Sequence, residues 1–294
     1  MKRLKFLLLV LISLVIVESV VLLSNKSESS ANKPVQSADS KLLPDTEVEL
    51  LSAAQKYFHD GEYEQAIRAY EKVLSSTSDK EYIYLNIANT YRYWGKYEDS
   101  EKMFKKALEL NPNNDYIYTD LGKLYRNMKK YSDAESMFKK ALAINPNSGQ
   151  AYGYGLGYLY RDLGRYNDAL NMFKKALELN PSDFNYMAMG DIYRDMQNYS
   201  ESEKMFKKAL EINPKSESYL GLGWLYLEMG QYEKAEGDLK GFLQNIREKG
   251  EVYYALGQVY IKQGRVEEAR KSLERAVELN PDNQLFKDGL RNLN

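Results

Sequence analysis

A six-residue segment, MFKKAL, occurs four times in this chain without a change. Its four phenylalanines are separated by 34, 35 and 33 residues, and weaker copies continue the spacing in both directions; the phenylalanines are Phe104, Phe138, Phe173 and Phe206. A fixed period of this length is typical of a stacked array, because one such unit cannot bury its apolar side chains without its neighbours. The repeat is therefore the strongest constraint on the fold.

The repeat predicts seven units between Glu47 and Asn283. Residues 284–294 follow the array, and the helical spacing of Leu285, Phe286 and Leu290 predicts a C-terminal capping helix over the last unit. We expect the unit boundaries at about 47–80, 81–114, 115–149, 150–182, 183–215, 216–249 and 250–283.

Each unit holds two apolar runs at helical spacing with a turn between them, which indicates a helical hairpin. The third unit shows the pattern best, with Tyr118, Leu121, Gly122 and Tyr125 on the first run and Tyr131, Ala134, Phe138 and Ala141 on the second, before Pro146. This order of aromatic, Leu-Gly, Tyr, Ala, Phe and Pro resembles the tetratricopeptide repeat family. The resemblance covers about 237 residues. It implies an all-α, right-handed superhelical solenoid of about seven hairpins that serves as a scaffold for protein–protein interaction.

Small residues and turns carry three further predictions. Gly122 and Ala134, with their equivalents in other units, are expected to face each other and let the two helices approach closely. Most of the first helices end in a glycine, because a residue with left-handed backbone conformation is favoured there. Lys129 and Gln197 occupy two of these sites, so the two turns should be strained or differently wound. The one extra residue before the fourth unit is expected in a loop, at 148–149.

The amino-terminal segment has the pattern of a membrane anchor. Lys2, Arg3 and Lys5 precede an apolar run from Phe6 to Leu23, and eighteen helical residues reach roughly 27 Å, close to the roughly 30 Å thickness of the hydrocarbon core. We predict a transmembrane signal-anchor over 1–23, with residues 4–23 in the membrane; a cleaved signal peptide is the alternative.

The charge before the apolar run predicts a cytoplasmic amino terminus and extracytoplasmic repeats. With cleavage, the repeats would instead be periplasmic or secreted. Residues 24–46, which are polar and rich in serine, are predicted to be a flexible linker.

Composition favours a binding protein over an enzyme. Lysine and arginine total 41 against 42 acidic residues, which gives no field to attract nucleic acid, and the chain has no cysteine and one histidine, His59. Gly153, Gly155 and Gly157 resemble a phosphate-binding loop, but they lack a preceding strand and are interpreted as helix-packing positions. No catalytic residue, metal site or cofactor is predicted.

In the family that the repeats resemble, the first helices line a concave groove. Reading the corresponding positions gives a predicted partner-binding set: Asn86, Asn89, Arg92, Tyr116, Lys123, Arg126, Tyr154, Tyr158, Arg161, Arg194 and Trp224. Four of these are arginines that follow the patterned tyrosine, one per unit, and they suit carboxylates along an extended chain. Alternatively, each arginine packs on a tyrosine and pairs locally. The chaperone-type carboxylate clamp of some family members is not supported, because Leu51, Leu85 and Asp120 stand at its polar or basic positions.

These observations predict a non-enzymatic, membrane-tethered scaffold that binds an extended acidic or polar segment of a protein partner. Two alternatives stay open. One is an envelope polysaccharide-binding protein whose groove aromatics Tyr116, Tyr154, Tyr158 and Trp224 stack on sugar rings. The other is a scaffold that self-associates by end-to-end stacking of arrays.

Overall fold

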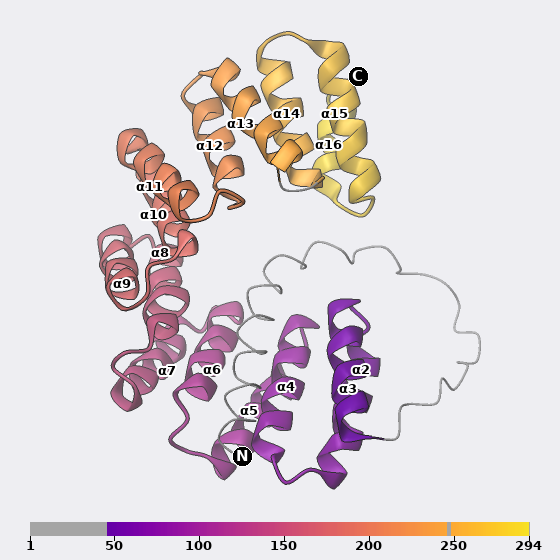
Figure 1. The fold of residues 1–294 in the computed structure, drawn as a ribbon, viewed down its shortest axis with the longest axis vertical. Coiled ribbons are helices and arrows are strands. Elements are labelled where there is room, and N and C mark those ends of the chain that lie inside the picture. The colour runs from indigo at the N-terminus through magenta and orange to yellow at the C-terminus, as the bar shows by residue number, and fades with distance from the viewer. Residues whose placement is uncertain (1–45, 246–247, 294) are drawn as a thin grey trace, which may run out of the picture. The chain divides into compact units, whose positions relative to one another are not determined.

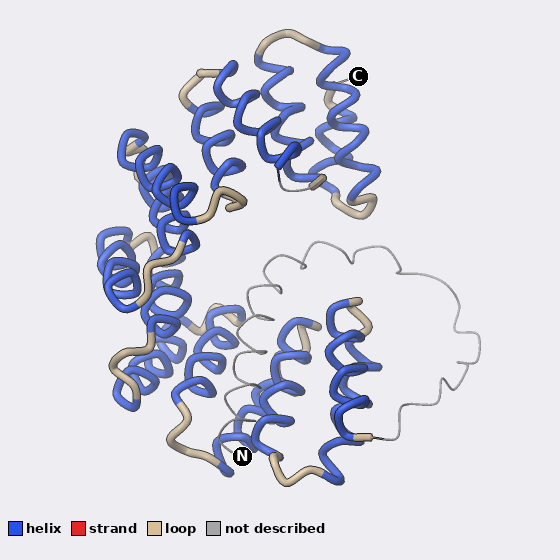
Figure 2. The backbone as a smooth tube through the Cα atoms, viewed as in Figure 1, coloured by secondary structure: helices blue, strands red, loops and turns tan. Residues whose placement is uncertain are grey.

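The computed structural model describes residues 46–245 and 248–293, and these form helices joined by short loops, with no strand among them (Figure 2). The all-α prediction is confirmed. The chain divides into two compact units, Met1–Pro112 and Asn113–Asn294. The predicted membrane anchor and nearly all of the predicted linker lie outside the described residues. Within the described part, no helix is both long enough and apolar enough to cross a membrane.

The first unit contains two antiparallel hairpins, drawn in indigo and purple in Figure 1. Thr46 caps its first helix: the Thr46 hydroxyl accepts a hydrogen bond from the amide of Glu49 at 3.3 Å, and the Glu49 carboxylate accepts one from the Thr46 amide at 3.3 Å. The helices are α2 (Glu47–His59), α3 (Tyr63–Ser76), α4 (Lys80–Tyr93) and α5 (Tyr97–Leu110).

The second unit continues the pattern with five hairpins and a last short helix (Figure 1). Phe286, on that last helix, is 2% exposed and stacks on Tyr254 of the preceding hairpin. The elements are α6 (Asp115–Asn127), α7 (Tyr131–Ile144), η1 (Ala151–Gly157), α8 (Tyr158–Asp162), α9 (Tyr166–Leu179), α10 (Asp183–Asp195), α11 (Tyr199–Ile212), α12 (Ser218–Glu228), α13 (Tyr232–Asn245), α14 (Gly250–Lys262), α15 (Val266–Leu279) and α16 (Gln284–Arg291).

The repeated phenylalanine is the main packing residue of the four hairpins that carry it, and all four copies are fully buried. Phe138 on α7 lies against Gly122 of its own hairpin, where an added Cβ would come within 2.5 Å of the ring, and against Gly155 of the next hairpin, at 2.7 Å. The expected approach of the Gly122 and Ala134 sites is supported at the equivalent positions, where Ser202 Oγ donates a hydrogen bond to the Gly190 carbonyl at 2.8 Å and Ser100 Oγ donates one to the Ala88 carbonyl at 2.7 Å. The phenylalanine ring fills the space that the missing side chain of the glycine leaves. One ring thus closes its own hairpin and joins it to the following one.

The extra residue of the fourth repeat lies inside a helix, so the prediction of a loop at 148–149 is wrong. Helical structure begins at residue 149, and the seven residues Ala151–Gly157 form a π-helix that runs directly into α8. A π-helix absorbs one additional residue without breaking the helix. The glycines on it allow close packing, since a Cβ at Gly157 would lie 2.7 Å from the ring of Phe173. Their interpretation as packing positions is confirmed.

Two turns without glycine keep the left-handed conformation of the others. Lys129 and Gln197 both have φ of 58°, whereas Gly164 at the same site has φ of 70°. A side chain in this conformation costs roughly 1–2 kcal/mol, because its Cβ crowds the following carbonyl. The predicted strain is confirmed, and the turns are not differently wound.

Replacing either strained residue by glycine should stabilise the protein. We expect Lys129→Gly and Gln197→Gly each to raise the free energy of unfolding by about 0.5–1 kcal/mol, because relief of the strain exceeds the entropy that glycine adds to the unfolded chain. Urea unfolding followed by circular dichroism measures the effect. Gly164→Ala is the matched control: a Cβ there meets nothing within 4 Å, so its expected destabilisation comes from backbone conformation alone. Equal stability of all three variants would contradict this account.

Candidate functional site

The predicted site residues of the second unit lie on its first helices, α6, η1 with α8, α10 and α12. Contacts between these helices form a continuous network that we call the arginine face, defined by Arg126, Arg161 and Arg194 with the carboxylates of Asp162, Asp195 and Glu228. Each arginine follows the buried or half-buried tyrosine of its repeat. The helical repeat therefore places one guanidinium on the same side of each hairpin.

Every arginine of this face contacts an acidic residue of the next hairpin. Arg126 Nε lies 3.4 Å from Asp162 Oδ2, and Arg161 Nε lies 2.8 Å from Asp195 Oδ2. Arg194 Nε lies 3.7 Å from Glu228 Oε1. These three side chains are 18–25% exposed, so the pairs are only partly screened by water. The geometry favours the interpretation in which the arginines pair within the protein and join neighbouring hairpins.

Asp191 lies between two of these arginines. Its carboxylate is 3.2 Å from Nη2 of Arg194 and 3.9 Å from Nη1 of Arg161. Burial raises the pKa of Asp191, and the two guanidinium groups offset only part of that rise. The arginine face is therefore a network of opposite charges and not a row of free cations.

An aromatic cluster lies beside this network, at the π-helix. The rings of Tyr154 and Phe184 are stacked, with centroids 4.1 Å apart and planes within 8°, and Tyr158 packs on Phe184 at 5.9 Å and edge-on against Phe173 at 5.4 Å. Nη1 of Arg126 donates a hydrogen bond to the Tyr154 carbonyl at 3.3 Å. Because a π-helix shifts the backbone hydrogen-bonding register, this turn of the chain both carries the stacked tyrosine and offers its carbonyl to the arginine face.

Two further predicted residues lie at the edge of the cluster on α6. Tyr116 is 53% exposed. The Lys123 ammonium pairs with Asp120 at 2.9 Å and lies 5.9 Å from the centroid of the Tyr154 ring. The structure therefore brings Lys123, Arg126, Tyr154 and Tyr158 together, with Tyr116 exposed on the same helix as Lys123.

The remaining predicted residues lie elsewhere. Asn86, Asn89 and Arg92 are on α4 in the first unit, where Asn86 Nδ2 donates to the Tyr82 carbonyl at 2.7 Å and Arg92 Nη2 donates to Asn89 Oδ1 at 3.0 Å. Trp224 on α12 packs beside Tyr254 of α14, with ring centroids 6.2 Å apart. The predicted set is thus divided among three locations.

The acidic partners of the arginines are the residues that sequence reasoning missed. Asp162, Asp195 and Glu228 are 33 residues apart, and each directly follows the position of the patterned arginine. The same period that located the arginines would have located them. The signal was present, but carboxylates on a charged helical array are too common to stand out without the packing.

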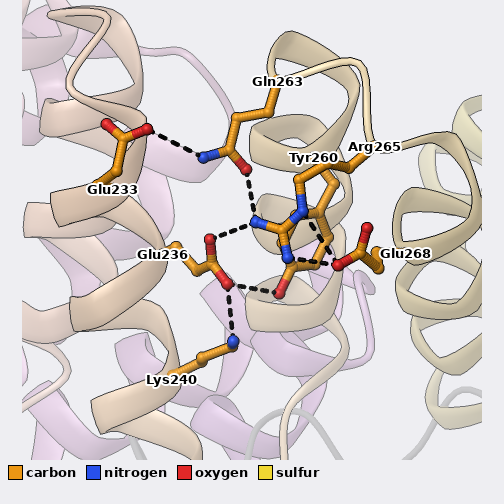
Figure 3. A network of polar contacts seen from close by, with 7 residues as sticks. All are labelled: Glu233, Glu236, Lys240, Tyr260, Gln263, Arg265 and Glu268. Carbon is orange, nitrogen blue, oxygen red and sulfur yellow. Dashed lines mark hydrogen bonds and ion pairs between the residues drawn. The ribbon is translucent and has the colours of Figure 1, made fainter.

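A second polar network, on the other edge of the hairpins, is structural. The Glu236 carboxylate accepts hydrogen bonds from the Tyr260 hydroxyl at 3.1 Å, from Lys240 Nζ at 2.7 Å and from Arg265 Nη1 at 2.7 Å (Figure 3). Arg265 also pairs with Glu268. Equivalent bonds join Tyr160 to Glu135 at 3.0 Å and Tyr226 to Glu203 at 2.9 Å. The recurrence of this bond at three of the junctions between hairpins indicates that it joins neighbouring repeats. No metal-binding group of three or more acidic, histidine or cysteine residues is found in the part of the chain that the structure describes.

Stacked antiparallel hairpins that are joined by a buried ring and by repeated ion pairs define the class of helical repeat arrays. Three sequence models described as tetratricopeptide repeat match this chain, one over residues 79–147 and 184–240, one over 154–183 and one over 250–283. The chain belongs to the tetratricopeptide repeat family. This fold is generally a non-enzymatic scaffold for protein–protein interaction.

Solved structures of other proteins share the fold. A tetratricopeptide repeat protein from Parabacteroides merdae is 21% identical, with a TM-score of 0.65 over 84% of this chain and 98% of its own. Cut9, in the APC/C hetero-tetramer Cut9–Hcn1, is 17% identical, with a TM-score of 0.63 over 85% of this chain and 49% of Cut9. Yeast Tom70 is 16% identical, with a TM-score of 0.61 over 92% and 66%. No curated protein matches the chain in sequence.

The ion pairs of the arginine face should stabilise the array measurably. In a double-mutant cycle with Arg161→Gln and Asp195→Asn, we expect a coupling free energy of about 1 kcal/mol, because both side chains are partly buried and their bond crosses between hairpins. The pair of Lys204 and Glu201 is the control, since its side chains are 57% and 38% exposed on one helix, and its coupling should stay below about 0.5 kcal/mol. Urea unfolding gives both values. Equal coupling for the two pairs would mean that an ion pair of the arginine face stabilises the protein no more than an exposed pair within one helix.

Proposed function

We propose that this protein is a membrane-tethered scaffold that binds an extended segment of a partner protein across α6, η1, α8 and α10 of its second unit. The observation that carries the proposal is the aromatic cluster at the π-helix. Tyrosine and phenylalanine rings supply a large contact area at a low entropic cost, and they are enriched where proteins bind one another. Tyr116 and Tyr154 provide such rings beside the charged network.

The charge pattern suggests the chemistry of the partner. Each arginine of the face already has a carboxylate within 4 Å, so an acidic segment would have to compete with Asp162, Asp191 and Asp195. A polar segment with an apolar side chain over the rings makes contacts without displacing an ion pair. We therefore favour a polar partner over a strongly acidic one.

Two observations from outside the site support a protein partner. The tetratricopeptide repeat fold is generally used for protein–protein interaction. Cut9, which shares the fold, forms a hetero-tetramer with the protein Hcn1.

Of the rings considered for sugar binding, Tyr158 is packed against Phe173 and Phe184 and Tyr154 is stacked on Phe184. One face of the Tyr154 ring and the ring of Tyr158 are therefore in contact within the protein, which leaves fewer free ring faces for stacking on sugars.

A crosslinking experiment tests the partner-binding face. A photoreactive phenylalanine analogue at Tyr116 of the full-length protein should trap a discrete partner in the native membrane, and the same group at Ser136, exposed on α7, should not. Tyr154→Ala should lower the yield of the adduct about tenfold, which is the usual effect of truncating an aromatic residue in an interface. Circular dichroism of the variant controls for folding. Equal adducts from both positions, or no effect of Tyr154→Ala, would argue against the proposed face.

The membrane tether is proposed from the apolar run over residues 4–23 and the basic residues before it. We expect the protein to stay in the membrane fraction after alkaline carbonate treatment and a variant lacking residues 4–23 to be released. Protease added outside the cytoplasmic membrane should digest the repeats. Release of the intact protein by carbonate, or a mature chain shortened at its amino terminus, would show that the segment does not anchor it.

A further inference from the structure

The first unit has an open hollow that the arginine face does not share. Residues on α3 and residues at the end of α4 and in the following turn line it: Glu64, Arg68 and Glu71 with Tyr91, Trp94 and Lys96. No residue of this hollow belongs to the predicted site set. Its lining combines two aromatic rings with two carboxylates, Glu64 and Glu71, and two cationic side chains, Arg68 and Lys96.

The aromatic side of the hollow is ordered. The rings of Tyr91 and Trp94 are parallel within 5°, with centroids 6.4 Å apart, and Tyr63 lies 6.4 Å from Trp94 at a tilt of 32°. The rings of Tyr91 and Trp94 pack against the core of this unit, so the core holds them in place. A tryptophan face is the strongest aromatic acceptor of a cation, because its quadrupole places negative charge above the ring.

The hollow already holds a cation of its own chain. The Lys96 ammonium lies 3.4 Å from the centroid of the Trp94 ring, and Lys96 is an exposed residue only two positions further along the chain. Its long side chain has many accessible rotamers, so leaving the ring costs little. The contact shows that the geometry of this site accepts an ammonium group.

The two carboxylates of the hollow differ in whether they have an ion-pair partner. Glu64 pairs with Arg68 at 2.6 Å, but the two side chains are 60% and 66% exposed, so the pair is weak. Glu71 makes no hydrogen bond or ion pair with any residue that the structure describes. Burial raises the pKa of the nearby Tyr91 hydroxyl, and the Glu71 carboxylate raises it further, which shows that its negative charge reaches the aromatic side. This charge is available to a second cation.

We infer that this hollow binds a lysine or arginine side chain from a basic segment of a partner protein, with the cation over the Trp94 ring or on the Glu71 carboxylate. Lys96 occupies the ring in the free protein and gives way to the ligand. A neutral sugar fits less well, since the resident ammonium covers the ring and the free carboxylate is uncompensated. An acidic segment would have to approach the Glu64 and Glu71 carboxylates, and the two resident cations are already engaged, Arg68 with Glu64 and Lys96 with the Trp94 ring. The site is independent of the arginine face, which lies in the other unit.

Tryptophan fluorescence can observe this site directly, because the chain has only two tryptophans. In the full-length protein with Trp224→Phe, Trp94 is the sole tryptophan. Titration with tetralysine at about 0.15 M salt, where long-range attraction is screened, should change its emission saturably. Tetraglutamate should leave the emission unchanged.

Three variants in this background separate the site from general charge attraction. Glu71→Gln should weaken tetralysine binding about three- to tenfold, whereas Glu98→Gln, which removes the same charge from an exposed position on α5, should not. Lys96→Ala should strengthen binding about threefold, because the resident cation no longer competes. An unchanged emission, equal effects of Glu71→Gln and Glu98→Gln, or weaker binding by Lys96→Ala would each overturn the inference. Circular dichroism confirms that the variants remain helical.

Discussion

The contact between the phenylalanine of a second helix and the glycine of a first helix is the interaction on which the array depends. A fully buried phenylalanine contributes roughly 1.5–3 kcal/mol of transfer free energy, and in the third, fourth and fifth hairpins the ring lies against a glycine of the first helix. Phe138 meets Gly122 within its hairpin and Gly155 in the next, and Phe206 meets Gly190 and Gly221 in the same way. Because one ring serves both contacts, formation of a hairpin and its stacking on the next are physically coupled. This coupling explains why a phenylalanine recurs at this position in four successive hairpins.

Ion pairs and polar hydrogen bonds orient neighbouring hairpins in this protein, whereas apolar burial supplies most of the stability. The ion pairs of the arginine face and the tyrosine–glutamate bonds on the other edge both cross from one hairpin to the next, at intervals set by the repeat. Individually, such partly exposed pairs contribute about 1 kcal/mol or less to stability. Their geometry nevertheless fixes how one hairpin is oriented on its neighbour, because a guanidinium fork reaches a carboxylate only over a narrow range of positions. The opposite charges also leave the face close to neutral, which makes side-chain shape and aromatic contact more important than long-range attraction in the choice of a partner.

The two surfaces singled out for binding both arise where the repeat is broken. The aromatic cluster of the second unit forms at the π-helix, where one extra residue brings Tyr154 onto Phe184. In the first unit, Trp94 stands where four of the other turns have methionine or leucine, and the Lys96 ammonium lies over its ring. An array of equal hairpins offers a uniform surface, so specificity must come from departures of this kind. A π-helix often marks a functional position for the same reason: it costs stability and is kept only where its geometry is used.

The sequence by itself determined the all-helical class, the number and period of the hairpins, the capping of α2 by Thr46, and the strain at Lys129 and Gln197. These features depend on the local backbone and on the spacing of apolar residues, which can be followed along the chain. Only the tertiary structure decided that each arginine has an acidic partner in the next hairpin, that a phenylalanine ring fills the space over the glycine, and that the extra residue enters a helix. Each of these depends on contacts between residues about 16 to 36 positions apart. A linear pattern names the residues of such a contact but not their distance, because the distance is set by how one hairpin packs on another.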